Sequence, residues 1–197
     1  MKTGLATAGA AILLATCMAI PAEAQRAPQA DIEARMDAQR TAMDRLGRLD
    51  GTWRGKAVYY GPQGPHEITQ TERLGPMLDG TIKVVQGRGY EADGSVSFNA
   101  FAVIGYDPDT GTYAMQSWND GREGRFELEL SDNGYRWEIP AGSMTIRYEA
   151  EITASTYHEW GVRVVEGQDP QKFFDMQLTR VGDTDWPAAG VLGPKQP

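Results

Sequence analysis

The spacing of apolar residues along the chain changes once, close to residue 50. Before that point, residues 31–49 carry an apolar stripe at helical spacing, formed by Ile32, Met36, Met43 and Leu46. Ala, Arg, Gln and Met are strong helix formers, and they are frequent in this segment. We expect a helix that packs its stripe on the rest of the domain or plugs one end of it. A helix that binds a partner is the alternative.

From Thr52 onward the period of the pattern is two. Short segments rich in β-branched and aromatic residues alternate with turn residues such as Asp93-Gly94, which supply the positive φ of tight hairpins. The predicted strands are residues 52–60, 66–74, 81–90, 95–106, 112–118, 125–130, 135–139, 143–153, 156–166 and 172–181. No helical pattern separates them, so crossovers between parallel strands are not expected. We predict an all-β fold, an up-and-down antiparallel β-barrel of about ten strands with one N-terminal helix.

Alternation within the predicted strands assigns an inner and an outer face to several of them. In four of the later strands one face is polar or charged and the other is mainly apolar. The predicted inner faces contain Phe126, Trp137, Met144, Tyr148 and Met176. Aromatic rings and methionines suit either a packed core or an apolar cavity.

The strand predicted over residues 156–166 carries one of the two histidines. Tyr157 and Glu159 lie on its polar face, and His158 and Trp160 lie on its more apolar face. We therefore predict that His158 points into the barrel. A histidine in that position can coordinate an iron or zinc centre or hydrogen-bond a ligand. The alternative is a core histidine that is bonded to a tyrosine or to a backbone carbonyl.

The inward-facing side chains would line any space inside the barrel. The predicted lining residues are His158, Trp160, Tyr59, Trp118, Phe126, Trp137, Met144, Tyr148 and Met176. A ligand site of this kind has a volume of about 300–1,000 Å³. The alternative is a barrel filled by its own side chains.

The first 24 residues have the features of a secretory signal peptide. Lys2 precedes an Ala-rich apolar run, and Ala22-Glu23-Ala24 fits the small-x-small rule for cleavage before Gln25. The run is shorter than the roughly 20 residues of a membrane span, so we expect no transmembrane segment. We predict a periplasmic or secreted protein. Its parts are a signal peptide over 1–24, a lead and helix over 25–49, the barrel over 50–181 and a flexible tail over 182–197.

Cys17 is the single cysteine, and it lies inside the predicted signal segment. It is either an apolar residue that is removed with the signal, or the lipidated residue of a Leu14-Ala15-Thr16-Cys17 lipobox. We favour removal, because Thr16 fits poorly before a lipidated cysteine. The mature chain would then contain no cysteine and no disulfide.

Composition and motifs exclude several classes of function. The net charge is −8, which disfavours nucleic acid as a partner because phosphates are repelled. His66 and His158 are far apart and form no metal-binding motif. The glycines of Gly87-Arg88-Gly89 predict a strand bulge rather than a phosphate site. No nucleophile elbow or nucleotide-binding loop is present, so we favour a non-enzymatic role over catalysis and expect no cofactor.

Four segments carry a family resemblance, and one of them is the turn from Leu74 to Gly80. The segment from Leu49 to Gly55 contains Gly51-Thr52-Trp53, which resembles the Gly-x-Trp motif that opens the first strand of lipocalins and other calycins. Gly105-Tyr106-Asp107-Pro108-Asp109-Thr110-Gly111-Thr112-Tyr113 is similar to a hairpin of the bacterial domain-of-unknown-function-1579 family, and Leu178-Thr179-Arg180-Val181 is similar to its last strand. The resemblance implies a lipocalin-like β-barrel of uncharacterised role.

The calycin resemblance also implies a structural role for two residues. In such barrels the first-strand tryptophan closes one end and an arginine of the last strand lies across it. Here these residues would be Trp53 and Arg180. A guanidinium over an indole contributes roughly 0.5–2 kcal/mol.

These observations lead to a binding protein as the functional expectation. We expect the barrel to hold a small apolar molecule. One alternative is a haem-binding barrel of the nitrobindin type, in which His158 would be the axial ligand, although the first strand departs from that family's pattern. The other alternative is a structural or interaction protein with a packed barrel.

Overall fold

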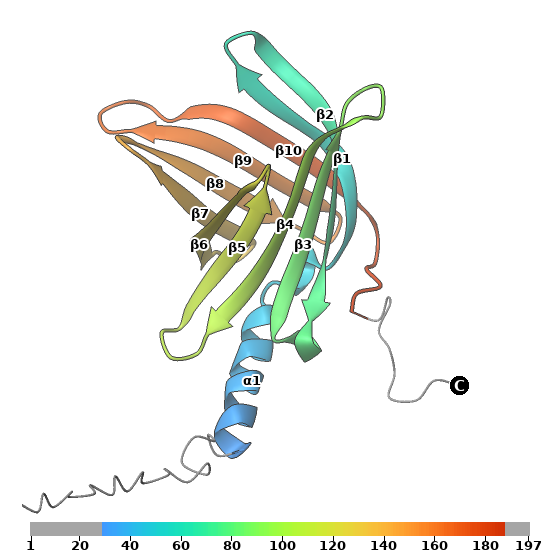
Figure 1. The fold of residues 1–197 in the computed structure, drawn as a ribbon, viewed down its shortest axis with the longest axis vertical. Coiled ribbons are helices and arrows are strands. Elements are labelled where there is room, and N and C mark those ends of the chain that lie inside the picture. Colours follow the sequence, from blue (N-terminus) through green and yellow to red (C-terminus); the bar gives the residue numbers. More distant parts are fainter. Residues whose placement is uncertain (1–28, 188–197) are drawn as a thin grey trace, which may run out of the picture.

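The computed structural model describes residues 29–187, which form a closed antiparallel barrel with one helix at its end (Figure 1). The helix α1 spans Gln29–Asp44, and a 3-10 turn, η2, spans Gly47–Leu49. The strands are β1 (Gly51–Gly61), β2 (Gly64–Met77), β3 (Ile82–Tyr90), β4 (Val96–Asp107), β5 (Thr112–Asn119), β6 (Arg122–Leu130), β7 (Gly134–Ala141), β8 (Met144–Ile152), β9 (Thr156–Val165) and β10 (Gln171–Gly182). A second 3-10 turn, η3, spans Leu78–Gly80 between β2 and β3.

Every strand pairs with its neighbours in the sequence, and β1 pairs with β10 to close the barrel. The predicted all-β, up-and-down, lipocalin-like barrel with one N-terminal helix is therefore confirmed. Tight hairpins use glycines with positive φ, for example Gly94 (φ 83°) and Gly121 (φ 73°). A side chain is strained at such angles, which explains why glycine occupies both positions.

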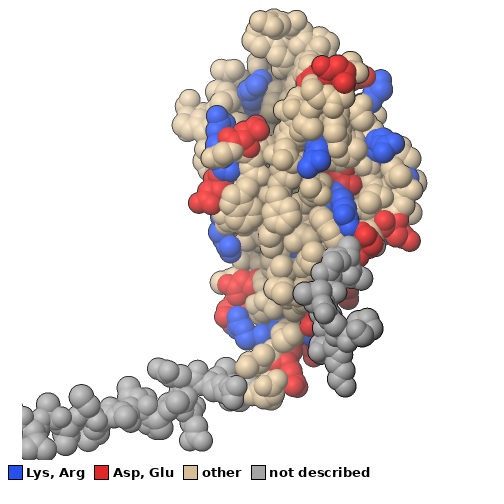
Figure 2. Space-filling view, turned by 45° about the vertical axis from the view of Figure 1, so that its right-hand side comes forward, with Lys and Arg blue, Asp and Glu red and all other residues tan. Residues whose placement is uncertain are grey.

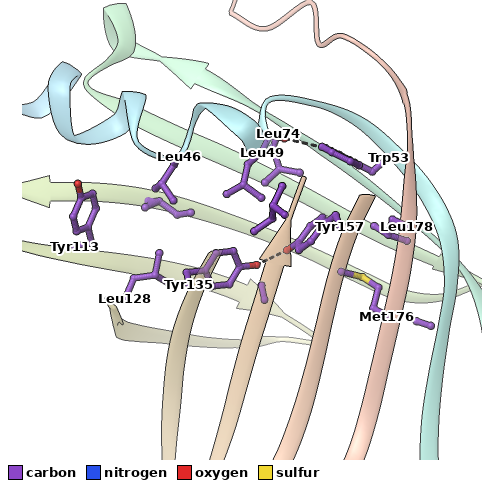
Figure 3. Close-up of a cluster of buried hydrophobic side chains, with 14 of the residues drawn as sticks. Leu46, Leu49, Trp53, Leu74, Tyr113, Leu128, Tyr135, Tyr157, Met176 and Leu178 are labelled. Atoms are coloured by element: carbon purple, nitrogen blue, oxygen red, sulfur yellow. Dashed lines mark hydrogen bonds between the residues drawn. The ribbon is translucent and has the colours of Figure 1, made fainter. Parts of the chain in front are cut away.

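The end of the barrel near α1 contains the core (Figure 3). Met43 of α1 is 3% exposed, and Leu46 and Leu49, which follow the helix, are 4% and 1% exposed. Ile32, in the first half of α1, is 37% exposed. The helix therefore plugs the barrel with its C-terminal turns only. The predicted helix over 31–49 is too long, because the chain leaves the helix after Asp44 to enter β1 through η2.

Trp53 and Arg180 lie together at this closed end, as the family resemblance implied. Trp53 is 1% exposed, and its indole N–H donates to the carbonyl oxygen of Leu49 at 2.9 Å. The Arg180 guanidinium carbon lies 5.4 Å from the centre of the indole ring. The pair joins η2, β1 and β10.

The chain beyond β10 lies on the outer wall of the barrel as far as it is described. The Arg73 guanidinium of β2 lies 4.2 Å from the centre of the Trp186 ring and also pairs with Asp185. A flexible tail was predicted from residue 182, but residues 183–187 are held against β2 by these contacts. The remainder of that tail, the predicted signal peptide and Cys17 lie outside the described residues.

Basic and acidic side chains are mixed over the face of the barrel shown in Figure 2.

Between residues 29 and 187, no helix combines the length and the apolar character that crossing a membrane requires.

Candidate functional site: the barrel interior

The interior is filled near α1 and accessible to solvent toward the other end. Leu128 of β6 and Tyr135 of β7 point inward near α1, and they are 3% and 9% exposed. Farther from α1 on β6, β7 and β8, the inward residues Phe126, Trp137 and Tyr148 are half-buried. Because these side chains point inward, we infer that the surface they expose lines the open half of the interior. We call this half of the interior the lumen.

Five aromatic rings from five strands line the lumen as a continuous belt. Their centroid distances are 4.9 Å for Phe126–Trp137, 4.4 Å for Trp137–Tyr148, 6.0 Å for Tyr148–Phe174 and 5.0 Å for Phe174–Tyr59. Trp137 and Tyr148 are stacked at an interplanar angle of 7°. Such rings offer a large, rigid apolar surface to a ligand. We call these five residues the aromatic belt.

Two backbone features shape the belt. Gly161 of β9 lies between Tyr148 and Phe174, and a Cβ there would be 3.0 Å from the Tyr148 ring. The register of β10 shifts between Lys172 and Phe174, and Phe173 also packs against the Tyr148 ring at 5.7 Å. A bulge of this kind aims adjacent residues at one face of a sheet.

The layer below the belt is polar. Glu159 of β9 is 9% exposed and accepts hydrogen bonds from the hydroxyl groups of Tyr135 (2.7 Å) and Tyr157 (2.8 Å). The two tyrosine hydroxyls also hydrogen-bond to each other. Burial raises the pKa of Glu159, and the hydrogen bonds from the tyrosines offset part of that rise.

Glu72 of β2 is the second carboxyl inside the barrel. Burial raises its pKa to about 8, the hydrogen bond that the Gln70 amide donates at 2.7 Å lowers it in part, and the charge of Glu159 raises it further. The glycines of β3 create the room for this pair. A Cβ at Gly87 would lie 2.7 Å from the Glu72 carboxylate, and one at Gly89 would lie 3.1 Å from the Gln70 carbonyl oxygen.

The predicted orientation of β9 is wrong. Tyr157 pairs with Leu178 and Glu159 pairs with Met176, both of which are inward and at most 3% exposed. His158 therefore lies on the outer wall, where its Nε2 is 3.3 Å from the Asp175 carboxylate. The alternation is misleading because the barrel buries the polar face of this strand in its own hydrogen-bond network. The haem alternative loses the inward histidine on which it rested.

Trp160 and Trp118 were also predicted to line the interior, and both lie outside. Trp160 shares the outer face of β9 with His158, and their rings are 4.9 Å apart. Trp118 is 41% exposed on the outer wall, where its ring centroid lies 6.2 Å from that of Phe101 and its indole N–H donates to Glu123 at 3.1 Å. The register alternates residues between faces, and Met115 and Ser117 occupy the inward positions of β5.

The other predicted lining residues point inward. Tyr59, Phe126, Trp137 and Tyr148 belong to the aromatic belt, Met144 is half-buried on the same face of β8 as Tyr148, and Met176 is 3% exposed beside Glu159. The structure brings the four belt residues together and places Met176 below them.

The sequence analysis missed the polar layer, namely Gln70, Glu72, Tyr135, Tyr157 and Glu159, as a set of functional candidates. One signal pointed to it. Two glycines at alternate positions of a strand, as in Gly87-Arg88-Gly89, indicate a close approach as well as a bulge. The register between β3 and β4 shifts after Gly89, so the predicted irregularity lies next to the two glycines that face Glu72 and Gln70.

A groove of about 600 Å³ runs along the outer wall over β1, β10 and β9. His158, Asp175 and Gln177 contribute to it. Within it the Asp175 carboxylate already accepts hydrogen bonds from Lys172 (2.5 Å) and Gln177 (3.1 Å). The Asp175 carboxylate thus has a basic partner, whereas Glu72 has none among the described residues. We therefore take the lumen as the candidate site.

Metal ligands do not cluster in the part of the chain that the structure describes, where no group of three His, Cys, Asp or Glu side chains is arranged to hold an ion. His66 is exposed at the far end of β2 and contacts Glu91 at 3.1 Å.

Comparisons with known proteins support the architecture. No family model matches the chain, and no curated protein is significantly similar to it. The crystal structure of Rv2717c from M. tuberculosis is similar over 71% of this chain and 96% of that one, with a TM-score of 0.54 and 14% identity. At this identity the similarity shows the fold alone. The family resemblance of the Gly105–Tyr113 hairpin stays a prediction.

Proposed function

We propose that this chain is a binding protein that holds a small molecule in the lumen. The aromatic belt carries the proposal, because four of its five rings keep exposed surface although they point inward. A barrel that served only as a packed core would bury these rings against one another, as it does near α1. Inward-facing aromatic surface that is not covered by other side chains is typical of small-molecule sites.

The chemistry of the interior favours an amphipathic ligand over a purely apolar one. The belt offers aromatic surface to an apolar body. Below it, Glu72 and Gln70 present polar atoms, and a polar floor of this kind fixes the orientation of a bound molecule. From the sequence we expected a small apolar ligand. We now propose an apolar molecule that also carries a polar end.

The first test uses N-phenyl-1-naphthylamine, an apolar dye that is uncharged at neutral pH and fluoresces in apolar surroundings. The purified protein is expected to bind it. Trp137→Ala, which removes the central ring of the belt, should weaken binding about tenfold. Trp160→Ala is the matched control, because its indole lies on the outer wall. Absence of dye binding, or equal weakening by both variants, would contradict a lumen site.

The natural ligand can be sought by native mass spectrometry of the protein purified from the cells that make it, followed by organic extraction. A stoichiometric adduct that is lost in Trp137→Ala and kept in Trp160→Ala would identify it. An adduct that both variants retain would place binding elsewhere, for example in the outer groove.

The proposal includes export. Its support is the signal-like segment that ends at Ala24. Fractionation and intact mass should find a mature form that begins at Gln25. A form that begins at a lipidated Cys17 would instead indicate an anchored protein, and an uncleaved cytoplasmic form would contradict export.

A further inference from the structure

The floor of the lumen has a hydrogen-bond acceptor that lacks a donor. Gln70 is 2% exposed, and its amide nitrogen donates to one oxygen of Glu72. The carbonyl oxygen of Gln70 is buried and has no hydrogen-bond partner. An unpaired buried acceptor is costly, and native proteins rarely retain one without a reason.

Two glycines of β3 allow the Glu72 and Gln70 side chains to lie close against that strand. Gly87 faces the Glu72 carboxylate and Gly89 faces the Gln70 carbonyl oxygen, and a Cβ at either position would be within 3.1 Å of those groups. Glu72 nevertheless keeps partial exposure although it points inward. A ligand in the lumen would therefore meet Glu72 before it meets the more deeply buried Gln70.

Among the described residues, no basic group contributes to the pKa shift of Glu72. The other ionisable group that acts on it is the Glu159 carboxyl. The basic groups of the closed end are engaged elsewhere. Lys83 of β3 pairs with Asp50. Arg180, two strands away across β1, lies over Trp53 and donates to Asp183 at 2.7 Å. The floor thus combines a carboxylate without a counter-ion and an acceptor without a donor.

We propose that the lumen selects an organic cation, an ammonium or amidinium group on an apolar body, with the cation donating to Glu72 and Gln70 and the body lying along the aromatic belt. This inference rests on the proposed function and assigns its ligand class. A cation with several N–H donors satisfies both acceptors at once. The rings of the belt add favourable cation–π contact.

Binding of a cation is coupled to a proton. The Glu72 carboxyl, with a pKa of about 8 in the free protein, must be ionised to pair with the ligand. The titratable groups that face it are Glu159, Tyr59, Tyr135 and Tyr157. The pKa of each tyrosine is raised above its usual value, so the three tyrosines stay neutral near pH 7, and burial raises the pKa of Glu159 as well. Glu72 is then the group that releases a proton when a cation binds.

The test compares 2-phenylethylamine, which is protonated at neutral pH, with 2-phenylethanol, its uncharged analogue of similar size. Isothermal titration calorimetry measures both with the wild-type protein. The amine should bind about tenfold to a hundredfold more tightly than the alcohol. In Glu72→Gln the amine should lose that advantage, whereas Glu67→Gln, a change on the same strand in an exposed ion pair with Lys56, should keep it.

A second measurement needs no variant. The affinity of the wild-type protein for the amine should fall by up to about tenfold per pH unit as the pH is lowered from 8 to 6, because the proton on Glu72 competes with the cation. The affinity for the alcohol should stay constant. This measurement keeps the proposal testable if Glu72→Gln fails to fold, which circular dichroism and thermal unfolding would reveal.

The outcomes separate this inference from the proposed function. If the wild-type protein binds the uncharged dye but shows no preference for the amine, the proposal of a lumen site stands and the proposal of a cationic ligand is overturned. A preference that persists in Glu72→Gln, or that does not depend on pH, also overturns it. If neither the dye nor the amine binds, the lumen function itself fails.

Discussion

The guanidinium of Arg180 lies over the indole ring of Trp53, and the two residues are register partners across the seam where β10 closes on β1. The Trp53 indole N–H also donates to Leu49, which links this seam to the turn that follows α1. A single stacked pair therefore connects the two ends of the barrel sheet to its plug.

We expect three substitutions on the strands of this seam to lower the free energy of unfolding by different amounts. Trp53→Ala should lower the free energy of unfolding by about 3–5 kcal/mol because it empties a buried volume. Arg180→Ala should cost about 0.5–2 kcal/mol. Arg54→Ala, on the exposed face of β1, should change stability by less than about 0.5 kcal/mol. Urea unfolding monitored by circular dichroism measures all three, and an Arg180→Ala effect equal to that of Arg54→Ala would contradict a role for the stacked pair.

The buried carboxyls predict that the protein is less stable at higher pH. The pKa of Glu72 is about 8 in the folded chain and near 4.5 when unfolded, so between these values the folded state holds a proton that the unfolded state has lost. The free energy of unfolding should then fall as the pH rises from 5 to 8, by up to about 1.4 kcal/mol per pH unit from this group.

Glu159 contributes in the same direction, since its pKa is also raised. Glu72→Gln should flatten the slope over this window, and Glu67→Gln should leave it unchanged. Urea unfolding at pH 5, 6, 7 and 8 gives the slopes. Identical slopes in the wild type and Glu72→Gln would show that Glu72 is not held neutral by the fold.

The glycine opposite Glu72 predicts a local steric effect. Gly87→Ala places a methyl group 2.7 Å from the carboxylate, which must move, and we expect a loss of about 1–3 kcal/mol in stability. Gly105→Ala is the control, because a Cβ there meets nothing within 4 Å. Combining Gly87→Ala with Glu72→Ala should recover most of the loss. A double variant that shows simple additivity in thermal unfolding would rule out this contact.

The two halves of α1 predict different sensitivities. Met43 is 3% exposed in the plug, so Met43→Ala should lower the free energy of unfolding by about 2–5 kcal/mol. Ile32 is 37% exposed, and Ile32→Ala should have an effect below about 0.5 kcal/mol. Equal effects in denaturant titrations would mean that the whole helix packs on the barrel.

We expect substitutions at two adjacent residues of β9 to lower stability by different amounts. Tyr157→Phe removes a hydroxyl that is bonded to Glu159 and Tyr135 inside the barrel, and it should cost about 1–3 kcal/mol. His158→Ala acts on the outer wall, near Asp175, and should cost less than about 1 kcal/mol. A larger effect for His158→Ala would favour the orientation expected from the sequence.

Sequence patterns predicted the fold because they depend on local chemistry. Hairpin turns such as Asp93-Gly94 need a positive φ that glycine adopts without strain, and strand periodicity places Phe126, Trp137 and Tyr148 on one face. The barrel, its strand order and four belt residues followed from these rules. The family resemblance added the stacking of Arg180 on Trp53.

The tertiary structure alone decided which face of β9 points inward. By itself, the alternation of this strand favours burial of His158 and Trp160, which are less polar than Tyr157 and Glu159. The pairing with β8 and β10 reverses that choice, because Tyr135, from another strand, completes a hydrogen-bond network that makes the buried carboxyl of Glu159 tolerable. Burial of a polar group depends on partners that are distant in sequence, so periodicity within one strand cannot predict it.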